Sequence, residues 1–514
     1  MKNIKKIIID NKTKILFIII LVIAIFIRTY RVQEIPHGLN VDEAGMAYDA
    51  YCLANYKTDR YLNHLPVYLI NFGGGQSALY AYITSIFIKI IGFSIFTIRL
   101  PAIILGILAI IASYFMVKDK MGEKFALTFM ALITICPWHI MSSRWGLDCN
   151  LLAPMSIISI FLLLRSKNTL GYIIAGISFG ITLYTYALSY IILPIFLAIS
   201  LIYMLYTKKI KFKNIIIMGI PIFIFSIPLI LMILVNNGII EPINSFITIP
   251  KLFSYRGTEI KLSLIGKNIS FFKTMFTNDN LVYNALPEYG TVYIFAIFLS
   301  VFGFFLEIDN LVKSVKNRKF QINSIILFLF TAVIICMLII EDPNINKANA
   351  VFIPLIFFAT TTIQIIYRNY KVFFYIVIVL YIVNFMRFSN FYFNEYEIKY
   401  EYQPCFERDL TDTLNLVEQR FNDNDIYVYT SSPEPYIYTL VKNRISPYEF
   451  NENLHEGDKS DFSYGRYYFA RYYENEEIYD EAIYLVRDND NLVDILRDNG
   501  FKIEQMKKYF IAFK

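Results

Sequence analysis

Charged side chains are scarce in this sequence of 514 residues. Only 18% of the residues are charged, whereas 56% are hydrophobic and the mean hydropathy is +0.48. This balance excludes an ordinary water-soluble enzyme and is typical of a protein that crosses a membrane many times and carries a soluble appendage. The net charge of +6 gives no reason to expect a nucleic-acid partner, because the basic residues lie mainly in short loops.

Cysteine and histidine are also too few for a disulfide framework or a metal site. The five cysteines are scattered, odd in number and without the spacing of metal ligands: Cys52, Cys136, Cys149, Cys336 and Cys405. Only four histidines are present. We therefore expect no required cofactor; a divalent metal is allowed but not indicated.

Long apolar runs are what the sequence does contain. A membrane span needs about 20 mostly apolar residues, and eleven segments approach this length. They cover roughly residues 14–31, 98–117, 123–141, 148–164, 170–187, 189–206, 214–235, 291–308, 323–340, 350–367 and 371–388. The predicted fold class is a polytopic α-helical membrane protein with about 11 spanning helices.

The distribution of Lys and Arg predicts how these segments are oriented. The N-terminal tail and the short loops on its side hold 20 basic residues, whereas the short loops on the opposite side hold only Arg144 and Lys347. Basic loops tend to stay in the cytoplasm. We therefore expect a cytoplasmic N-terminus and an extracytoplasmic C-terminal region in the cell membrane.

Residues 32–97 then form a long first external loop. Its apolar stretch, residues 76–91, is short and carries Lys89, so we interpret it as an interfacial or re-entrant helix. Another surface helix is expected earlier in this loop, beginning near Val41, because small and aromatic residues recur there at helical spacing. The glycines at residues 73–75 predict a flexible turn, with no strand before them.

Two adjacent carboxylates, Asp42 and Glu43, lie at the start of the surface helix expected near Val41. One interpretation is local: Asn40 and Glu43 form a capping box, and both acids favour the positive end of the helix dipole. The other is chemical: Asp42 is a general base, and Glu43 orients an acceptor. Carboxylates near lipid are costly, which indicates a function, but these residues alone leave both interpretations open.

Four cations on the same predicted face are candidates for binding an anionic ligand. Lys57 and Arg60 lie in the first external loop, where a solvated turn is the structural alternative. Arg144 lies in a later loop and could instead pair with Asp148, four residues on. Lys347 could instead pair with the acids just before it.

From about residue 389 the sequence becomes polar. Helices are predicted at residues 409–421, 434–442 and 490–499, and strands at residues 425–429 and 482–486. This alternation predicts a small α/β domain over residues 391–514, separate from a membrane domain over residues 1–390. It contains no catalytic constellation, so we expect a binding or shielding role.

Several of these features together resemble a known family. They are Asp42-Glu43, residues 79–83 (Leu-Tyr-Ala-Tyr-Ile), Arg99-Leu100-Pro101, the stretch from Pro137-Trp138-His139-Ile140 to Asp148, and residues 346–354. In this order and at these membrane faces they resemble the GT-C superfamily of membrane glycosyltransferases, in the branch of protein O-mannosyltransferases and the lipid A aminoarabinose transferase. The resemblance covers most of residues 1–390 in layout.

This resemblance implies an inverting transfer of a sugar from a polyprenyl-phosphate donor to a hydroxyl of an extracytoplasmic glycan, lipid or protein. Asp42 would be the general base and Glu43 would help to hold the acceptor. The predicted substrate-binding residues are Arg144, Asp148, Lys347, Lys57 and Arg60. Membrane lipids are the other expected partners.

Two other classes stay open from the residues alone. They are a lipid or sugar transporter or flippase, and a non-catalytic envelope assembly protein. Transporters usually bury ionisable residues or broken helices near the membrane midplane. Here the charges gather at the outer face, which favours the enzyme.

Overall fold

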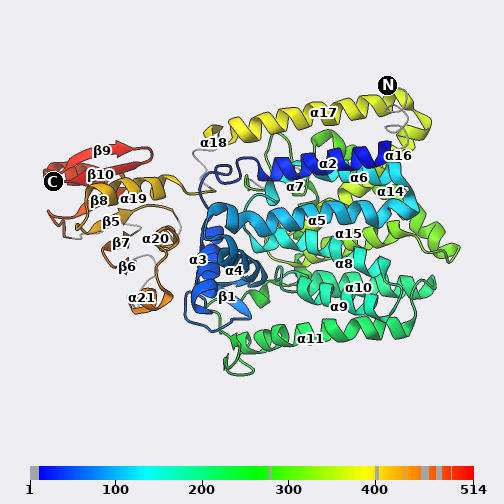
Figure 1. Ribbon diagram of the computed structural model, residues 1–514, viewed down its shortest axis with the longest axis horizontal. Coiled ribbons are helices and arrows are strands. Elements are labelled where there is room, and N and C mark those ends of the chain that lie inside the picture. The colour runs from blue at the N-terminus through cyan, green and yellow to red at the C-terminus, as the bar shows by residue number, and fades with distance from the viewer. Residues whose placement is uncertain are drawn as a thin grey trace.

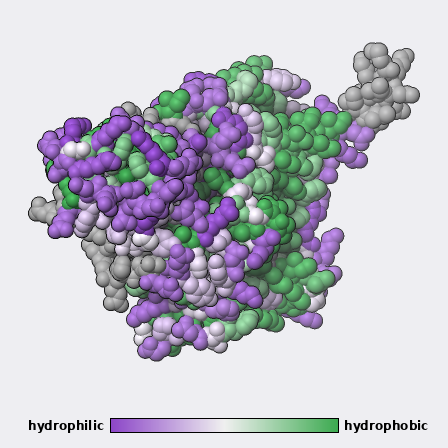
Figure 2. Space-filling view, turned by 60° about the vertical axis from the view of Figure 1, so that its left-hand side comes forward, coloured by the Kyte–Doolittle hydropathy of each residue, from purple (hydrophilic) through white to green (hydrophobic). Residues whose placement is uncertain are grey.

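A helical bundle and a C-terminal sheet domain lie side by side in the computed structural model (Figure 1). The structure describes residues 11–276, 281–399, 405–432, 434–452, 462–470, 477–487 and 489–514. Residues 1–10, which hold several of the lysines used to predict the cytoplasmic side, lie outside the described residues. Figure 2 shows that hydrophilic surface gathers over the sheet domain and hydrophobic surface along the bundle.

Each predicted apolar segment coincides with helical structure in the bundle. The helices are α2 (Lys12–Thr29), α5 (Ile95–Met121), α6 (Glu123–Thr134), α7 (Pro137–Ser142), α8 (Leu152–Arg165), α9 (Thr169–Thr182), α10 (Ser189–Tyr206), α11 (Phe212–Asn236), α14 (Ile294–Lys316), α15 (Ile322–Ile339), α16 (Phe352–Asn369) and α17 (Lys371–Asn394). Within the described chain, 8 helical stretches are long and apolar enough to cross a membrane. The protein is therefore a multi-pass membrane protein, while the count of eleven spans stays a prediction.

The segment predicted as one span over residues 123–141 is divided into α6 and α7. Pro137 is the first residue of α7, and Cys136 before it has an extended backbone. A proline disfavours helical geometry at the preceding residue, so the helix stops and restarts. The short 3-10 helices at Asp148–Leu151 and Asn349–Val351 similarly precede α8 and α16.

Close helix contact in the bundle depends on small residues. Gly303 of α14 lies against α16, where an added Cβ would come within 1.9 Å of the Phe358 carbonyl oxygen. The same helix pair buries Glu307, which accepts a hydrogen bond from Thr361 Oγ1 at 2.5 Å. Small residues allow helix backbones to approach inside a membrane.

The first external loop contains both predicted helices, α3 (Val41–Tyr56) and α4 (Leu79–Ile91). The helix α3 is largely buried, whereas α4 exposes Ile86, Ile90 and Ile91, as an interfacial helix would. The expectation of no strand before the glycines is wrong. An antiparallel hairpin of β1 (Tyr68–Asn71) and β2 (Gly74–Ser77) joins the helices.

The long external segment after α11 is irregular. It contains β3 (Ile243–Asn244), β4 (Thr248–Ile249), 3-10 helices at Arg256–Glu259 and Leu262–Leu264, α12 (Ile265–Asn268) and α13 (Phe271–Thr274). It touches the first external loop, because Val67 N donates to the Thr248 carbonyl at 2.9 Å. These two segments form one structure at this end of the bundle.

The C-terminal domain is an α/β domain, as predicted. Its sheet has the order β6-β7-β5-β8-β10-β9, with β5 parallel to both β7 and β8. The strands are β5 (Ile426–Tyr429), β6 (Phe462–Tyr464), β7 (Tyr467–Ala470), β8 (Ile483–Val486), β9 (Lys502–Met506) and β10 (Tyr509–Phe513). The helices are α18 (Tyr396–Lys399), α19 (Asp409–Arg420), α20 (Tyr436–Asn443), α21 (Pro447–Glu452) and α22 (Asp490–Asp498). The three predicted helices and two predicted strands are confirmed; the other strands and the short helices α18 and α21 were not predicted.

Candidate active site

Asp42 lies in the first turn of α3. The Asn40 side chain accepts a hydrogen bond from Asp42 N at 3.0 Å, and the Glu43 carboxylate accepts one from Asn40 N at 3.4 Å. The predicted capping box is therefore present. The Asp42 side chain is not needed for this cap and accepts a hydrogen bond from Asn71 Nδ2 of the hairpin at 3.0 Å. The capping box thus accounts for Glu43, whereas the Asp42 carboxylate lies in the first turn, where the helix dipole favours it, and contacts the hairpin.

Asn71 is itself held by a buried ion pair. Arg60 Nη2 donates to Asn71 Oδ1 at 3.1 Å and to Asp49 Oδ2 at 2.7 Å, and Arg60 Nε donates to Asp49 Oδ1 at 3.0 Å. Both charged side chains are 0% exposed. Burial lowers the pKa of Arg60, but the Asp49 carboxylate outweighs this effect and leaves that pKa above its ordinary value.

This network requires a glycine on α3. A Cβ at Gly45 would come within 2.5 Å of Asn71 Oδ1 and 2.7 Å of Arg60 Nη2. The hairpin therefore fits against α3 one turn after Asp42. Arg60, predicted as a substrate ligand, instead uses its described contacts to orient Asn71 toward Asp42, and it is buried away from solvent.

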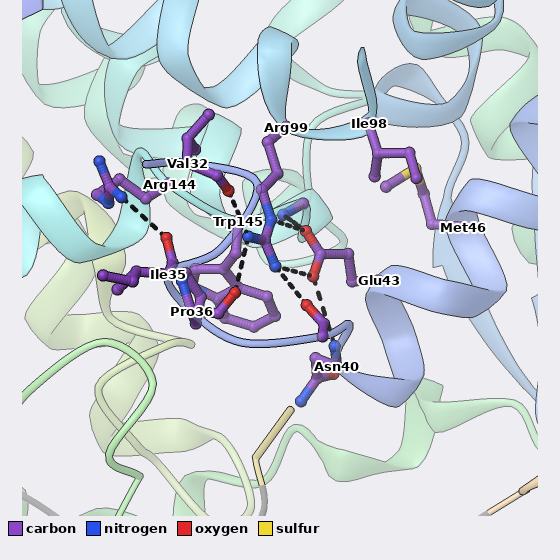
Figure 3. Close-up of polar contacts among 12 residues, drawn as sticks. Val32, Ile35, Pro36, Asn40, Glu43, Met46, Ile98, Arg99, Arg144 and Trp145 are labelled. Atoms are coloured by element: carbon purple, nitrogen blue, oxygen red, sulfur yellow. Dashed lines mark hydrogen bonds and ion pairs between the residues drawn. The ribbon is translucent and has the colours of Figure 1, made fainter. Parts of the chain in front are cut away.

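Glu43 forms a second buried ion pair, with Arg99 of α5 (Figure 3). Arg99 Nε donates to Glu43 Oε1 at 3.0 Å and Arg99 Nη2 to Glu43 Oε2 at 3.2 Å. Gly146 N also donates to Glu43 Oε1 at 2.6 Å. Both charged side chains are 0% exposed. These contacts favour a structural role for Glu43, and its expected role in holding an acceptor stays a prediction.

Arg99 and Arg144 together hold the chain between α2 and α3. Arg99 donates to the carbonyl oxygens of Val32, Pro36 and Gly38 at 2.6–2.9 Å. Arg144 donates to those of Ile27, Tyr30 and Ile35 at 2.7–2.9 Å. Arg144 is 0% exposed and lies over the rings of Tyr392 and Phe393. Its described hydrogen bonds go to backbone carbonyls rather than to Asp148, and it is not among the residues that line the cavity described next. These contacts favour a structural role, and its assignment to the donor stays a prediction.

Asp148 lines a cavity of about 430 Å³ at this end of the bundle. Its carboxylate accepts hydrogen bonds from Ser77 N at 3.1 Å and Cys149 N at 2.7 Å. The strand β2 thus joins the Asp42 network to the cavity wall.

The cavity is mainly apolar and aromatic, with a few charged groups. Its walls come from the hairpin, the start of α10, the end of α11 and the irregular external segment; they include Tyr68, Tyr186, Tyr190, Ile191, Met232, Leu252, Tyr255 and Ile340. Asp148, Glu259 and Lys347 are the charged side chains among its lining residues. This composition is typical of a site for an amphipathic ligand.

Lys347 is at this cavity wall, as a donor-binding residue should be. Its Nζ donates to the Glu341 carbonyl at 2.8 Å and lies 3.6 Å from Glu259 Oε2. The pairing considered from the sequence, with the side chains of Glu341 or Asp342, is replaced by a backbone contact and by Glu259. The side chain is only 14% exposed, so its charge acts in a partly dry site.

The remaining predicted ligand is Lys57, which lies on the surface. It ends α3 in a left-handed conformation, and its side chain is exposed. Among the described residues, no group of three or more His, Cys, Asp or Glu could hold a metal ion. The absence of a required cofactor stays a prediction.

The fold and part of the sequence are similar to those of known proteins. Residues 76–233 match the family model "Dolichyl-phosphate-mannose-protein mannosyltransferase". The fold matches ArnT from Cupriavidus metallidurans bound to undecaprenyl phosphate, at TM-score 0.56 and 11% identity over 98% of both chains. The chain is a membrane glycosyltransferase with the GT-C fold.

Other comparisons agree with this assignment at the level of the fold. The apo form of the same ArnT matches at TM-score 0.51 and 12% identity over 98% of both chains. The oligosaccharyltransferase of Archaeoglobus fulgidus, in complex with Zn and sulfate, matches at TM-score 0.53 and 14% identity, over 84% of this glycosyltransferase and 62% of the archaeal chain. No curated protein sequence gives a significant match. The match to the mannosyltransferase family model favours the enzyme over the transporter and assembly-protein alternatives.

The site contains residues of this glycosyltransferase that were not assigned from the sequence. They are Asn71, Asp49 and Glu259. Asn71 and Glu259 lie in irregular or hairpin segments, where no periodic pattern indicates which way a side chain points. Asp49 is seven residues after Asp42 on one helix, so its position on the same face was the one available sign.

Proposed function

We propose that this glycosyltransferase moves a sugar from a polyprenyl-phosphate donor to a hydroxyl group of an acceptor outside the cytoplasm, with inversion at the anomeric carbon. The observation that carries this proposal is the position of Asp42. Its carboxylate is oriented by Asn71 of β1, and β1 pairs with β2, whose Ser77 N donates to Asp148 in the wall of a cavity with apolar walls. A base beside an amphipathic cavity is what such a transfer requires.

The cavity supplies the features of a donor site. Apolar walls from α10 and α11 suit a prenyl chain, and Lys347 suits a phosphate group. The undecaprenyl phosphate named for the ArnT structure is a ligand of this chemical class, which supports the proposal. Glu259 beside Lys347 would have to share that cation with the phosphate, or release it when donor binds.

The reaction follows from these positions. Asp42 takes the proton of the acceptor hydroxyl as the acceptor oxygen forms a bond to the anomeric carbon. The bond from that carbon to the phosphate oxygen breaks, and the electron pair leaves with the phosphate. A single displacement inverts the carbon, and Lys347 stabilises the charge that develops on the leaving group. The acceptor is a glycan, lipid or protein hydroxyl.

The proposed topology puts Asp42, the cavity and the C-terminal domain outside the cytoplasm, with a cytoplasmic N-terminus. The excess of basic residues in the loops of the opposite side supports it. An active site outside the cytoplasm would also face a cell-surface acceptor.

The proposal is tested with purified protein in lipid nanodiscs and a panel of undecaprenyl-phosphate sugars. Asp42→Asn should lower turnover at least 1000-fold at unchanged thermal stability, because Asn can accept the Asn71 hydrogen bond but takes up no proton. Glu34→Gln, a surface carboxylate of the same loop, is the matched control. Near-normal turnover in Asp42→Asn, or retention of the anomeric configuration in the product, would contradict the mechanism.

The cation is tested in the same assay. Lys347→Met should raise the donor KM or lower kcat about tenfold or more, because a partly buried charge on the leaving phosphate is lost. Lys261→Met is the control, since Lys261 is an exposed cation of the same region that pairs with Glu341. Equal kinetics in the two variants would assign Lys347 to structure alone.

A further inference from the structure

The C-terminal domain contacts the segment that carries Asp42 at both of its ends. Near the start of α3, Glu407 N donates to the Leu39 carbonyl at 2.8 Å, and Asn40 Nδ2 donates to the Cys405 carbonyl at 2.7 Å. Beyond its end, Asn451 Nδ2 of α21 donates to the Arg60 carbonyl at 2.7 Å. Figure 1 shows α3 at the end of the bundle that faces this domain.

The first contact reaches Asp42 through one residue. The Asn40 side chain uses its two ends differently: Nδ2 donates to Cys405, and Oδ1 accepts from Asp42 N at 3.0 Å. The side chain that begins α3 is therefore fixed from outside by the C-terminal domain. A shift of Cys405 would move the cap and the first turn of the helix with it.

The second contact reaches Asp42 through the buried network. Asn451 holds the backbone of Arg60, whose guanidinium holds Asn71, whose amide donates to Asp42. Each of these hydrogen bonds is 2.7–3.1 Å long. The side chain of Asp42 is thus oriented by a residue of a different domain.

The domain surface at the first contact is rigid and closely fitted. Glu407 accepts hydrogen bonds from Arg487 and Ser432, each at 2.9 Å, and all three side chains are buried. Gly38 lies against it with a φ of +83°, and an added Cβ would come within 2.5 Å of the Glu407 carbonyl oxygen. A movement of the C-terminal domain at this contact should therefore move the start of α3 with it.

We propose that the C-terminal domain is a positioning element of the active site, which sets the place of Asp42 through Asn40 and through Asn451. This inference rests on the proposed function, in which Asp42 is the base. Misplacing a catalytic group by about 1 Å can cost about 100-fold in rate. The domain thus acts on catalysis through the position of Asp42.

The test uses the full-length protein and one variant for each route. Asn451→Leu removes the donor to Arg60, and Asn40→Ser keeps a capping oxygen but loses the reach to Cys405. Both should lower kcat about tenfold or more with the donor KM unchanged, because the donor cavity is not altered. Asn451→Gln, which restores a donor, should recover part of the loss. Asn424→Leu, which removes a hydrogen bond inside the domain to Glu481, is the control and should keep normal kcat.

A readout that needs no substrate accompanies the kinetics. Backbone hydrogen exchange should rise at the start of α3 in Asn40→Ser and around Arg60 in Asn451→Leu, and in neither place in the control. If both variants match the control in kcat and in exchange, the positioning role is wrong. If one variant does not fold, the other still decides the route that it tests.

The two proposals can fail separately. Turnover that survives in Asp42→Asn overturns the base assignment. Loss of turnover in Asp42→Asn with normal kcat in Asn40→Ser and Asn451→Leu overturns the positioning role alone. If both hold, Asn451→Leu should have no further effect in the Asp42→Asn background, because the two act through one group.

Discussion

Replacing Glu43 by Gln tests whether this residue acts in structure or in catalysis. The change keeps the size of the side chain but leaves Arg99 with no carboxylate, and both side chains are 0% exposed. Gln can still accept from Gly146 N and Arg99 Nε. Its amide group, however, faces Arg99 Nη2 and Asn40 N, so donors meet donors and the hydrogen bonds of 3.2 Å and 3.4 Å are lost.

The expected cost is large for a change of a few atoms. Breaking a buried ion pair from one side costs about 3–5 kcal/mol, because an uncompensated charge stays buried. Arg99 keeps its three carbonyl partners, Val32, Pro36 and Gly38, so we expect the lower end of that range, about 3 kcal/mol. Replacing both partners, in Glu43→Gln/Arg99→Met, should cost less than the sum of the single changes, by about 2 kcal/mol.

Thermal unfolding in nanodiscs, followed with a thiol-reactive dye, measures this effect. Four of the five cysteines are buried and become reactive on unfolding. Glu123→Gln is the control, since it breaks an exposed pair with Lys118 that should be worth less than about 1 kcal/mol. If Glu43→Gln is as stable as this control but has lost turnover, Glu43 is catalytic and the structural interpretation is refuted.

Two further predictions concern a buried acid and the topology. Burial, and then the charge of Asp49, raise the pKa of Asp59 to about 6 from an ordinary 3.8, so the folded state keeps a proton that the unfolded chain has lost. Stability should therefore fall by up to about 3 kcal/mol as the pH rises through this interval, and melting curves of Asp59→Asn should lack that fall. Cysteine labelling should place the C-terminal domain outside the cell. Cys405 is a poor site, because burial raises the pKa of its thiol to about 11. Lys502→Cys should instead react with a membrane-impermeant maleimide in intact cells, and reaction only after membrane disruption would contradict the topology; Lys313→Cys is the inside control.

What could be predicted from the sequence is what depends on neighbours in the chain. Apolar runs, the capping box of Asn40 and Glu43, and the alternation of helix and strand after residue 405 are all local patterns. The runs are helical in the structure, and the capping box and the alternation are confirmed. The acid at Asp42 could be singled out for the same reason. It lies in the first turn of a helix on the predicted outer face.

What could not be predicted depends on partners far away in the sequence. Glu43 meets Arg99 across 56 residues, and Asp148 meets Ser77 across 71. Isolated cations on an external face indicate either an anionic ligand or carbonyl groups that need donors. Arg144 donates to carbonyl groups, whereas Lys347 lies at the cavity. Nothing in the sequence around either residue distinguishes these two cases.

The arginine contacts also fix an order of events during synthesis of the chain. Arg144 follows the carbonyl of Ile27 by 117 residues, and Cys405 follows Asn40 by 365. At roughly 5–20 residues per second, Arg144 is added on the order of ten seconds after Ile27, and Cys405 well over ten seconds later still. Until Arg144 is added, the carbonyl groups of Ile27, Tyr30 and Ile35 lack this donor. Until Cys405 is added, the Asn40 side chain lacks its partner in the C-terminal domain. The contacts around the start of α3 are therefore complete only after the C-terminal domain has been synthesised.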